Sequence, residues 1–127
     1  MRSRRISLSN AGIAQDPASE RDCLLKALSL IQADNMIQPE DVVVITPNFV
    51  KSMPPDTGTV TGYDSLKALL GLVRQRNPKR MVVACGSGAK DTGSILDELG
   101  ILQMLRDESV EFIDLNHGPF TLKRLDH

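Results

Sequence analysis

The sequence predicts an α/β fold, a three-layer, Rossmann-like sandwich with a mostly parallel sheet of about four or five strands and helices on both faces. Two short apolar runs rich in β-branched residues, 42–45 and 81–84, have the continuous character of strands inside a parallel sheet. Amphipathic helical patterns alternate with strand patterns from residue 42 onward. This alternation favours parallel strands joined by right-handed crossovers.

Length and composition favour one domain covering residues 1–127. The 15 basic and 16 acidic residues give a net charge of -1, so we expect no nucleic acid and no membrane as a partner. No stretch approaches the roughly 18 apolar residues of a membrane helix, and no apolar segment follows the basic start, which predicts a cytoplasmic protein. Cys23 and Cys85 lie too far apart for a metal motif and are expected to be free thiols.

The first elements follow from local signals. Residues 5–9 alternate polar and apolar side chains, which predicts a short edge strand. Asp16 is a predicted N-cap, with Pro17 at the first helical position. After the strand at 42–45, residues 49–62 form a long loop without periodicity, a feature usually tied to function or mobility.

The second half continues the alternation. A helix is expected to begin at Thr61 or Asp64 and to end before an Asn-Pro pair. Two short helices should follow residues 86–88, separated by Gly100 as a C-cap. A strand is predicted at 110–113, and residues 121–125 alternate once more, as in a last, exposed strand.

The turn after the strand at 81–84 contains two glycines. Gly86 and Gly88 are expected to adopt positive φ or to permit close backbone approach, and Asp91 or Thr92 can cap the next helix. Such a turn aims N–H groups at the carboxyl edge of a sheet. Its spacing matches neither the dinucleotide fingerprint nor the P-loop, so a standard site of either kind is not expected. Alternatively, the glycines serve only the turn.

Polar residues follow three predicted strands, whose carboxyl ends share one edge of a parallel sheet. Together with the threonines of the long loop they would enclose a small anionic ligand, bound through backbone N–H groups and hydroxyls. The candidate ligand-binding residues are Asn48, Thr59, Thr61, Gly86, Ser87, Gly88, Thr92, Asp114 and Asn116.

The sequence assigns no catalytic residue, no cofactor and no metal ligand. His117, close to Asp114, has the chemistry of a base or a metal ligand, but a lone histidine beside a turn glycine is usually a loop residue. Cys85 is expected to be a buried strand residue rather than a nucleophile.

Several short segments in the same order resemble the DUF362 family of uncharacterised proteins: residues 43–50, 59–61, 81–88 with Asp91 and Thr92, and 112–116. The resemblance runs from about residue 41 to 116. It departs at Thr46, where the family has lysine, and at Tyr63, where a proline is expected. The resemblance implies an α/β domain of unproven activity, of which this chain would be the amino-terminal part. Iron–sulfur clusters linked to some members do not carry over to two isolated cysteines.

Two functions therefore stand side by side. The first is a ligand-binding domain, or part of an enzyme, with its site at the strand carboxyl ends. The alternative is a noncatalytic interaction or oligomerisation module whose exposed last strand pairs with another chain. An unprotected edge at residues 121–125 predicts a homo-oligomer in either case.

Overall fold

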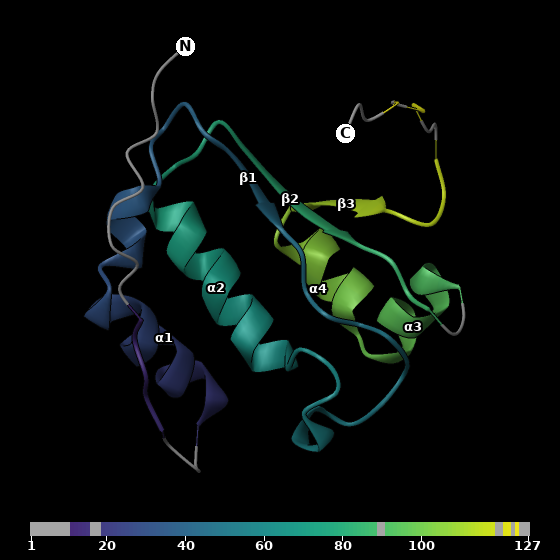
Figure 1. Cartoon of the computed structure of the whole chain (residues 1–127), viewed down its shortest axis with the longest axis horizontal. Helices are drawn as coiled ribbons and strands as arrows, with labels where there is room; N and C mark the ends of the chain where they lie inside the picture. Colours follow the sequence, from purple (N-terminus) through teal and green to yellow (C-terminus); the bar gives the residue numbers. More distant parts are fainter. Residues whose placement is uncertain (1–10, 16–18, 89–90, 119–120, 123, 125–127) are drawn as a thin grey trace. The chain divides into compact units, whose positions relative to one another are not determined.

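The computed structural model of the protein describes residues 11–15, 19–88, 91–118, 121–122 and 124 (Figure 1). The chain divides into two compact units. Unit 1 comprises Met1–Val43 and Asp64–Arg80, and unit 2 comprises Val44–Tyr63 and Met81–His127. The expected single domain over the whole chain stays a prediction.

Unit 1 begins with helix α1, Glu20–Leu30. Its N-cap is Ser19, whose side-chain oxygen accepts a hydrogen bond of 3.1 Å from the backbone N–H of Asp22. The predicted cap at Asp16 and the strand at 5–9 lie outside the described residues.

Helix α2, Tyr63–Gln75, has the expected amphipathic pattern. The side-chain oxygen Oε1 of Glu20 in α1 accepts hydrogen bonds from the N–H groups of Asp64 (3.0 Å) and Ser65 (3.3 Å), which places a negative charge at the N-terminus of α2. Beyond the other end of α2, the Arg76 guanidinium lies 3.2 Å from the carboxylate of Asp34 in the short 3₁₀ helix η1, Ala33–Met36. The buried side chains of α2 are Leu66, Ala68, Leu70 and Val73.

The sheet has three strands in the described part of the chain: β1, Val42–Ile45, β2, Arg80–Cys85, and β3, Glu111–Asp114. They lie in the order β1-β2-β3 in a parallel sheet, and β2 pairs with β3 in a register that runs from Val82↔Glu111 to Cys85↔Asp114. The predicted four or five strands and Rossmann-like layering are not confirmed. Of the expected last strand, the described residues 121, 122 and 124 belong to no strand.

Unit 2 buries its core between strands and two short helices. Helix α3, Thr92–Glu98, and helix α4, Ile101–Asp107, are joined through Gly100, whose φ of 69° is the left-handed conformation expected of a C-cap glycine. The two helices pack against each other, and α4 packs against β3 (Figure 1). Their fully buried side chains are Thr92, Ile95, Leu96, Ile101, Met104 and Leu105.

The long loop after β1 has a defined base. Phe49 and Val60 form an isolated antiparallel bridge, and their side chains are buried. Between them lies a short 3₁₀ helix, η2, Pro55–Thr57. The aperiodic sequence thus forms a closed loop that anchors two apolar side chains in unit 2.

Candidate functional site

The carboxyl end of β2 leads through the glycine turn to α3, whose N-cap is Asp91. The Asp91 carboxylate oxygen Oδ2 accepts hydrogen bonds from the N–H (2.8 Å) and the hydroxyl (3.0 Å) of Ser94. Aspartate is favoured at an N-cap because its oxygen satisfies a free N–H group of the first turn. The predicted cap is confirmed, and it places a carboxylate at this edge of the sheet.

The carboxyl end of β3 supplies a second carboxylate and an imidazole. Asp114 is the last residue of β3, and its Oδ1 accepts a hydrogen bond of 2.8 Å from the backbone N–H of Asn116. Its Oδ2 lies 3.0 Å from Nδ1 of His117, three residues further on. The turn after β3 therefore uses both oxygens of Asp114 to hold its own shape and to orient His117.

The pairing changes the protonation of both partners. Burial raises the pKa of Asp114, but hydrogen bonds from His117, Asn116 and Thr92 outweigh it and hold this pKa below its ordinary value. The hydrogen bond to Asp114 and the negative charge of that carboxylate raise the pKa of His117. The pair thus favours an ionised carboxylate beside a readily protonated imidazole.

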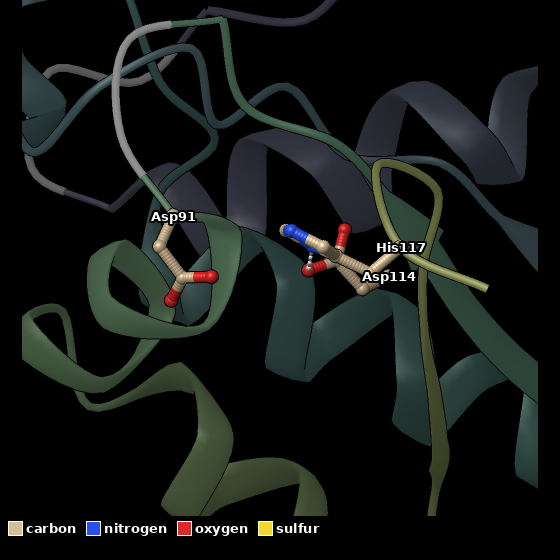
Figure 2. Close-up of side chains that lie close together, drawn as sticks. All are labelled: Asp91, Asp114 and His117. Atoms are coloured by element: carbon tan, nitrogen blue, oxygen red, sulfur yellow. Dashed lines mark hydrogen bonds and ion pairs between the residues drawn. The ribbon is translucent and has the colours of Figure 1, made fainter.

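Asp91, Asp114 and His117 come together at one point (Figure 2). Each offers one ligand atom, and these atoms all lie within 4.8 Å of one another. In Figure 2 the hydrogen bond joins His117 to Asp114, while the Asp91 carboxylate stands apart from that pair. Ligands on one ion at about 2.0–2.6 Å lie within about 4–5 Å of each other, so these three residues have the composition and spacing of a metal-ligand set.

No spacing motif in the sequence links these three residues. The sequence predicted Asp91 as a cap at the strand edge, and it gave His117 the chemistry of a base or a metal ligand but interpreted it as a loop residue. The available signal was positional, because Asp91 follows β2 and Asp114 ends β3, and the carboxyl ends of neighbouring parallel strands share an edge.

One group of predicted ligand-binding residues forms a network around the glycine turn. The Thr92 hydroxyl oxygen accepts a hydrogen bond of 3.1 Å from the Ser87 N–H. The Asn116 amide Nδ2 donates to the Ser87 carbonyl oxygen at 2.5 Å and lies 3.4 Å from the Thr92 hydroxyl oxygen. The structure thus brings Ser87, Thr92 and Asn116 together beside Asp114, as the parallel topology predicted.

A second group closes the base of the long loop. Thr61 N–H donates to the Asn48 carbonyl oxygen at 2.9 Å, and Asn48 N–H donates to the Thr61 hydroxyl oxygen at 3.0 Å. The Asn48 side-chain amide donates to the Thr59 carbonyl oxygen at 2.8 Å. The loop reaches the glycine turn through the Ser87 hydroxyl, which donates to the Val50 carbonyl oxygen at 2.9 Å.

The two glycines of the turn have different environments. Positive φ or close approach was expected at Gly86 and Gly88, and neither glycine has positive φ. A Cβ on Gly86 would lie 2.5 Å from Oδ1 of Asn116, whereas a Cβ on Gly88 would meet only Val50, at 4.0 Å. Gly86 therefore permits the close approach of a side chain, and Gly88 is under no comparable constraint.

Cys85, the last residue of β2, is buried, as expected from the sequence. Burial, together with the nearby charge of Asp114, raises the pKa of its thiol to about 11. A thiol that stays protonated at neutral pH is a poor nucleophile and a poor metal ligand. Cys85 contributes to packing beneath the site.

The fold and the site together define an α/β protein with a polar, carboxylate-rich edge where β2 and β3 end. A family model described as a domain of unknown function, DUF362, matches residues 43–126, and the chain belongs to this family. The match includes every residue of the candidate site, and residues 1–42 lie outside it. No curated protein matches the sequence. No solved structure matches it either.

No helix in the described ranges is both long and apolar enough to cross a membrane.

Proposed function

We propose that unit 2 binds a divalent metal ion between Asp91, Asp114 and His117, and that this ion holds a small anionic ligand at the carboxyl edge of β2 and β3. The observation that supports this proposal is the convergence of two carboxylates and one imidazole, with ligand atoms within 4.8 Å, from two separate segments. Metal sites commonly draw their ligands from such separate segments, held by a rigid scaffold.

Because two of the three clustered side chains are carboxylates, a cation must bind there before an anionic ligand can. A bare anion placed between Asp91 and Asp114 would meet two carboxylates, and like charges at such distances repel. A bound divalent cation reverses the sign of the local field and can bridge the carboxylates to an anionic ligand. The ion therefore reconciles the anionic ligand predicted from sequence with the acidic side chains of the site.

The ligand set favours a transition metal. Carboxylate oxygens coordinate Mg²⁺, Mn²⁺ and Zn²⁺, whereas an imidazole nitrogen favours Mn²⁺ or Zn²⁺ over Mg²⁺. Three protein ligands leave at least one coordination position open. The His117 side chain is 68% exposed, so a ligand can approach the ion from solvent.

Isothermal titration calorimetry of the whole, EDTA-treated chain measures its affinity for Mn²⁺ and Zn²⁺ and so tests the metal site. Asp91→Asn, Asp114→Asn and His117→Ala should each weaken binding by about tenfold or more, because each removes one ligand. Asp97→Asn is the matched control, since Asp97 is an exposed carboxylate of α3 outside the cluster. Equal affinity in the parent and in all three ligand variants would contradict the proposal.

A second titration, with inorganic phosphate or oxalate, tests the anionic ligand. Binding should require the metal ion and should disappear in EDTA. Anion binding that persists in EDTA would contradict the bridging role of the ion. No response to any metal or anion, together with a stable oligomer, would favour the interaction module instead.

A further inference from the structure

We propose that Asn116 is the positioning residue of this metal site: its side-chain amide fastens the turn after β3 to the turn after β2 and so keeps Asp91 beside Asp114 and His117. This inference rests on the proposed function, because it concerns the same ion. It assigns Asn116 a role inside the protein in place of direct contact with a ligand.

The hydrogen bonds of Asn116 cross between the two turns. Its Nδ2 donates to the Ser87 carbonyl oxygen at 2.5 Å and lies 3.4 Å from the Thr92 hydroxyl oxygen. Thr92 is fully buried, and its hydroxyl oxygen also accepts the Ser87 N–H. Side-chain hydrogen bonds thus join Asn116 to both Ser87 and Thr92.

The hydrogen bonds among Ser87, Thr92 and Asn116 restrict the position of Asp91. Asp91 directly precedes Thr92, the first residue of α3, so a fixed Thr92 leaves the Asp91 backbone little freedom. The Asp91 side chain is held by the Ser94 N–H and hydroxyl. The contact with Asn116 is therefore transmitted to the first metal ligand through one peptide bond.

Asn116 also lies between the other two ligands in the chain. Its backbone N–H holds Oδ1 of Asp114 at 2.8 Å, while Oδ2 of the same carboxylate lies 3.0 Å from His117. The last described backbone bond between the segments is Leu115 N–H to the Cys85 carbonyl oxygen, at 2.9 Å. Past this point the segments have left the ladder, and the Asn116 side chain joins them together with the hydrogen bond from Thr92 to Asp114.

Gly86 makes this arrangement possible. Any side chain at position 86 would place its Cβ 2.5 Å from Oδ1 and 3.0 Å from Cγ of Asn116. The first glycine of the turn is therefore explained by the amide that lies over it. The position of the Asn116 side chain therefore depends on the absence of a side chain at Gly86.

Asn116→Ala and Gln103→Ala form a matched pair of variants. Asn116 and Gln103 both lie in unit 2 and each donates a side-chain amide hydrogen bond, but Gln103 donates to Asp107 within α4. With Co²⁺ as the probe, affinity and visible absorption should be measured at a temperature where both variants are folded. Asn116→Ala should bind about tenfold or more weakly with an altered spectrum, and Gln103→Ala should bind like the parent.

Amide hydrogen exchange of the metal-free protein is the second measurement. Exchange of the Ser87 and Thr92 amides should accelerate in Asn116→Ala and not in Gln103→Ala. Asn116→Ser, whose side chain is too short to reach the Ser87 carbonyl oxygen, replaces Asn116→Ala if the alanine variant does not fold.

The outcomes separate the two proposals. If the parent binds Co²⁺ and Asn116→Ala binds it equally well, the positioning role is overturned while the metal site stands. If the parent does not bind Co²⁺, the proposed function fails. Accelerated exchange in Asn116→Ala would then show that the Asn116 side chain holds the two turns together without positioning a metal ion. Unchanged exchange in Asn116→Ala would show that the Asn116 side chain does not hold the two turns together, whether or not metal binds.

Discussion

Gly86 and Asn116 are in direct contact across the carboxyl edge of the sheet: a Cβ on Gly86 would lie 2.5 Å from the amide oxygen of Asn116. Gly86→Ala should displace that amide and break its hydrogen bonds to Ser87 and Thr92. We expect a loss of about 1–2 kcal/mol in the free energy of unfolding, measured by urea denaturation. Gly88→Ala, with its nearest contact at 4.0 Å, should cost less than 1 kcal/mol.

A double-mutant cycle makes this prediction specific. In an Asn116→Ala background the obstacle to a Cβ at position 86 is gone, so Gly86→Ala should cost much less than in the parent. Additive effects of the two substitutions would show that Gly86 is required for another reason.

The pKa of His117 should lie above its ordinary value of 6.5 in the metal-free protein, because Asp114 favours the protonated imidazole. Nuclear magnetic resonance titration of the His117 ring protons measures it directly. Asp114→Asn should lower this pKa toward the ordinary value. An unchanged pKa in that variant would contradict the pairing.

The same pair makes stability depend on pH. The raised pKa of His117 gives a contribution that is complete below the unfolded pKa of histidine and is lost as pH rises through the folded pKa. The lowered pKa of Asp114 gives a contribution that is present above the unfolded pKa of aspartate and is lost as pH falls through the folded pKa. The difference in stability between the parent and Asp114→Asn should therefore be largest at pH values above the unfolded pKa of aspartate and below the unfolded pKa of histidine.

Asp91 serves both α3 and the proposed metal ion, and two substitutions separate these roles. Asp91→Ala removes the cap and should lower the free energy of unfolding by about 0.5–2 kcal/mol in thermal or urea denaturation. Asp91→Asn should retain most of that stability, because asparagine caps nearly as well as aspartate. Both should weaken metal binding, since both remove the carboxylate. A capping defect as large in Asp91→Asn as in Asp91→Ala would contradict this division.

The two thiols should differ in reactivity. Cys85 is buried, with a pKa of about 11, whereas Cys23 is only partly buried. A disulfide reagent at pH 8 should therefore label one thiol in the folded protein and two in urea. Cys23→Ser should abolish labelling of the folded protein, and rapid labelling of that variant would show that β2 opens readily.

Self-association, expected from the sequence, stays a prediction. Unit 2 exposes several apolar side chains in or next to its strands, with exposed fractions of 57% for Val44, 39% for Ile113 and 51% for Leu115. Sedimentation velocity at micromolar concentration should give a species larger than 13.9 kDa, and Leu115→Ser should weaken the association. A monomer across the accessible concentrations would contradict this expectation.

Sequence reasoning located the scaffold of the site well. The β-branched runs marked β1 and β2, and parallel topology correctly predicted that residues after β2 and β3, such as Thr92 and Asn116, would meet. What the side chains do there depends on contacts between segments far apart in the sequence. No local pattern shows that the Asn116 amide reaches Ser87, 29 residues away, or that His117 lies beside Asp91.

The same limit applies to the glycine turn. Positive φ or close approach was expected at Gly86 and Gly88, and local sequence alone does not choose between these two reasons for a glycine. The actual constraint on Gly86 comes from the side chain of Asn116. Only the tertiary structure reveals that distant contact.

The hydrogen bonds between Asn48 and Thr61 close the base of the long loop, so a change in the length of the loop need not move the strands. Closure free energy grows slowly, by about 0.6 kcal/mol for each doubling of loop length, so an insertion near the exposed Gly58 should leave Phe49 and Val60 in the core. A Cβ on Gly58 would meet nothing within 4 Å. The tip of this loop is thus a suitable place for a fluorescent reporter or an affinity tag that leaves the proposed metal ligands untouched.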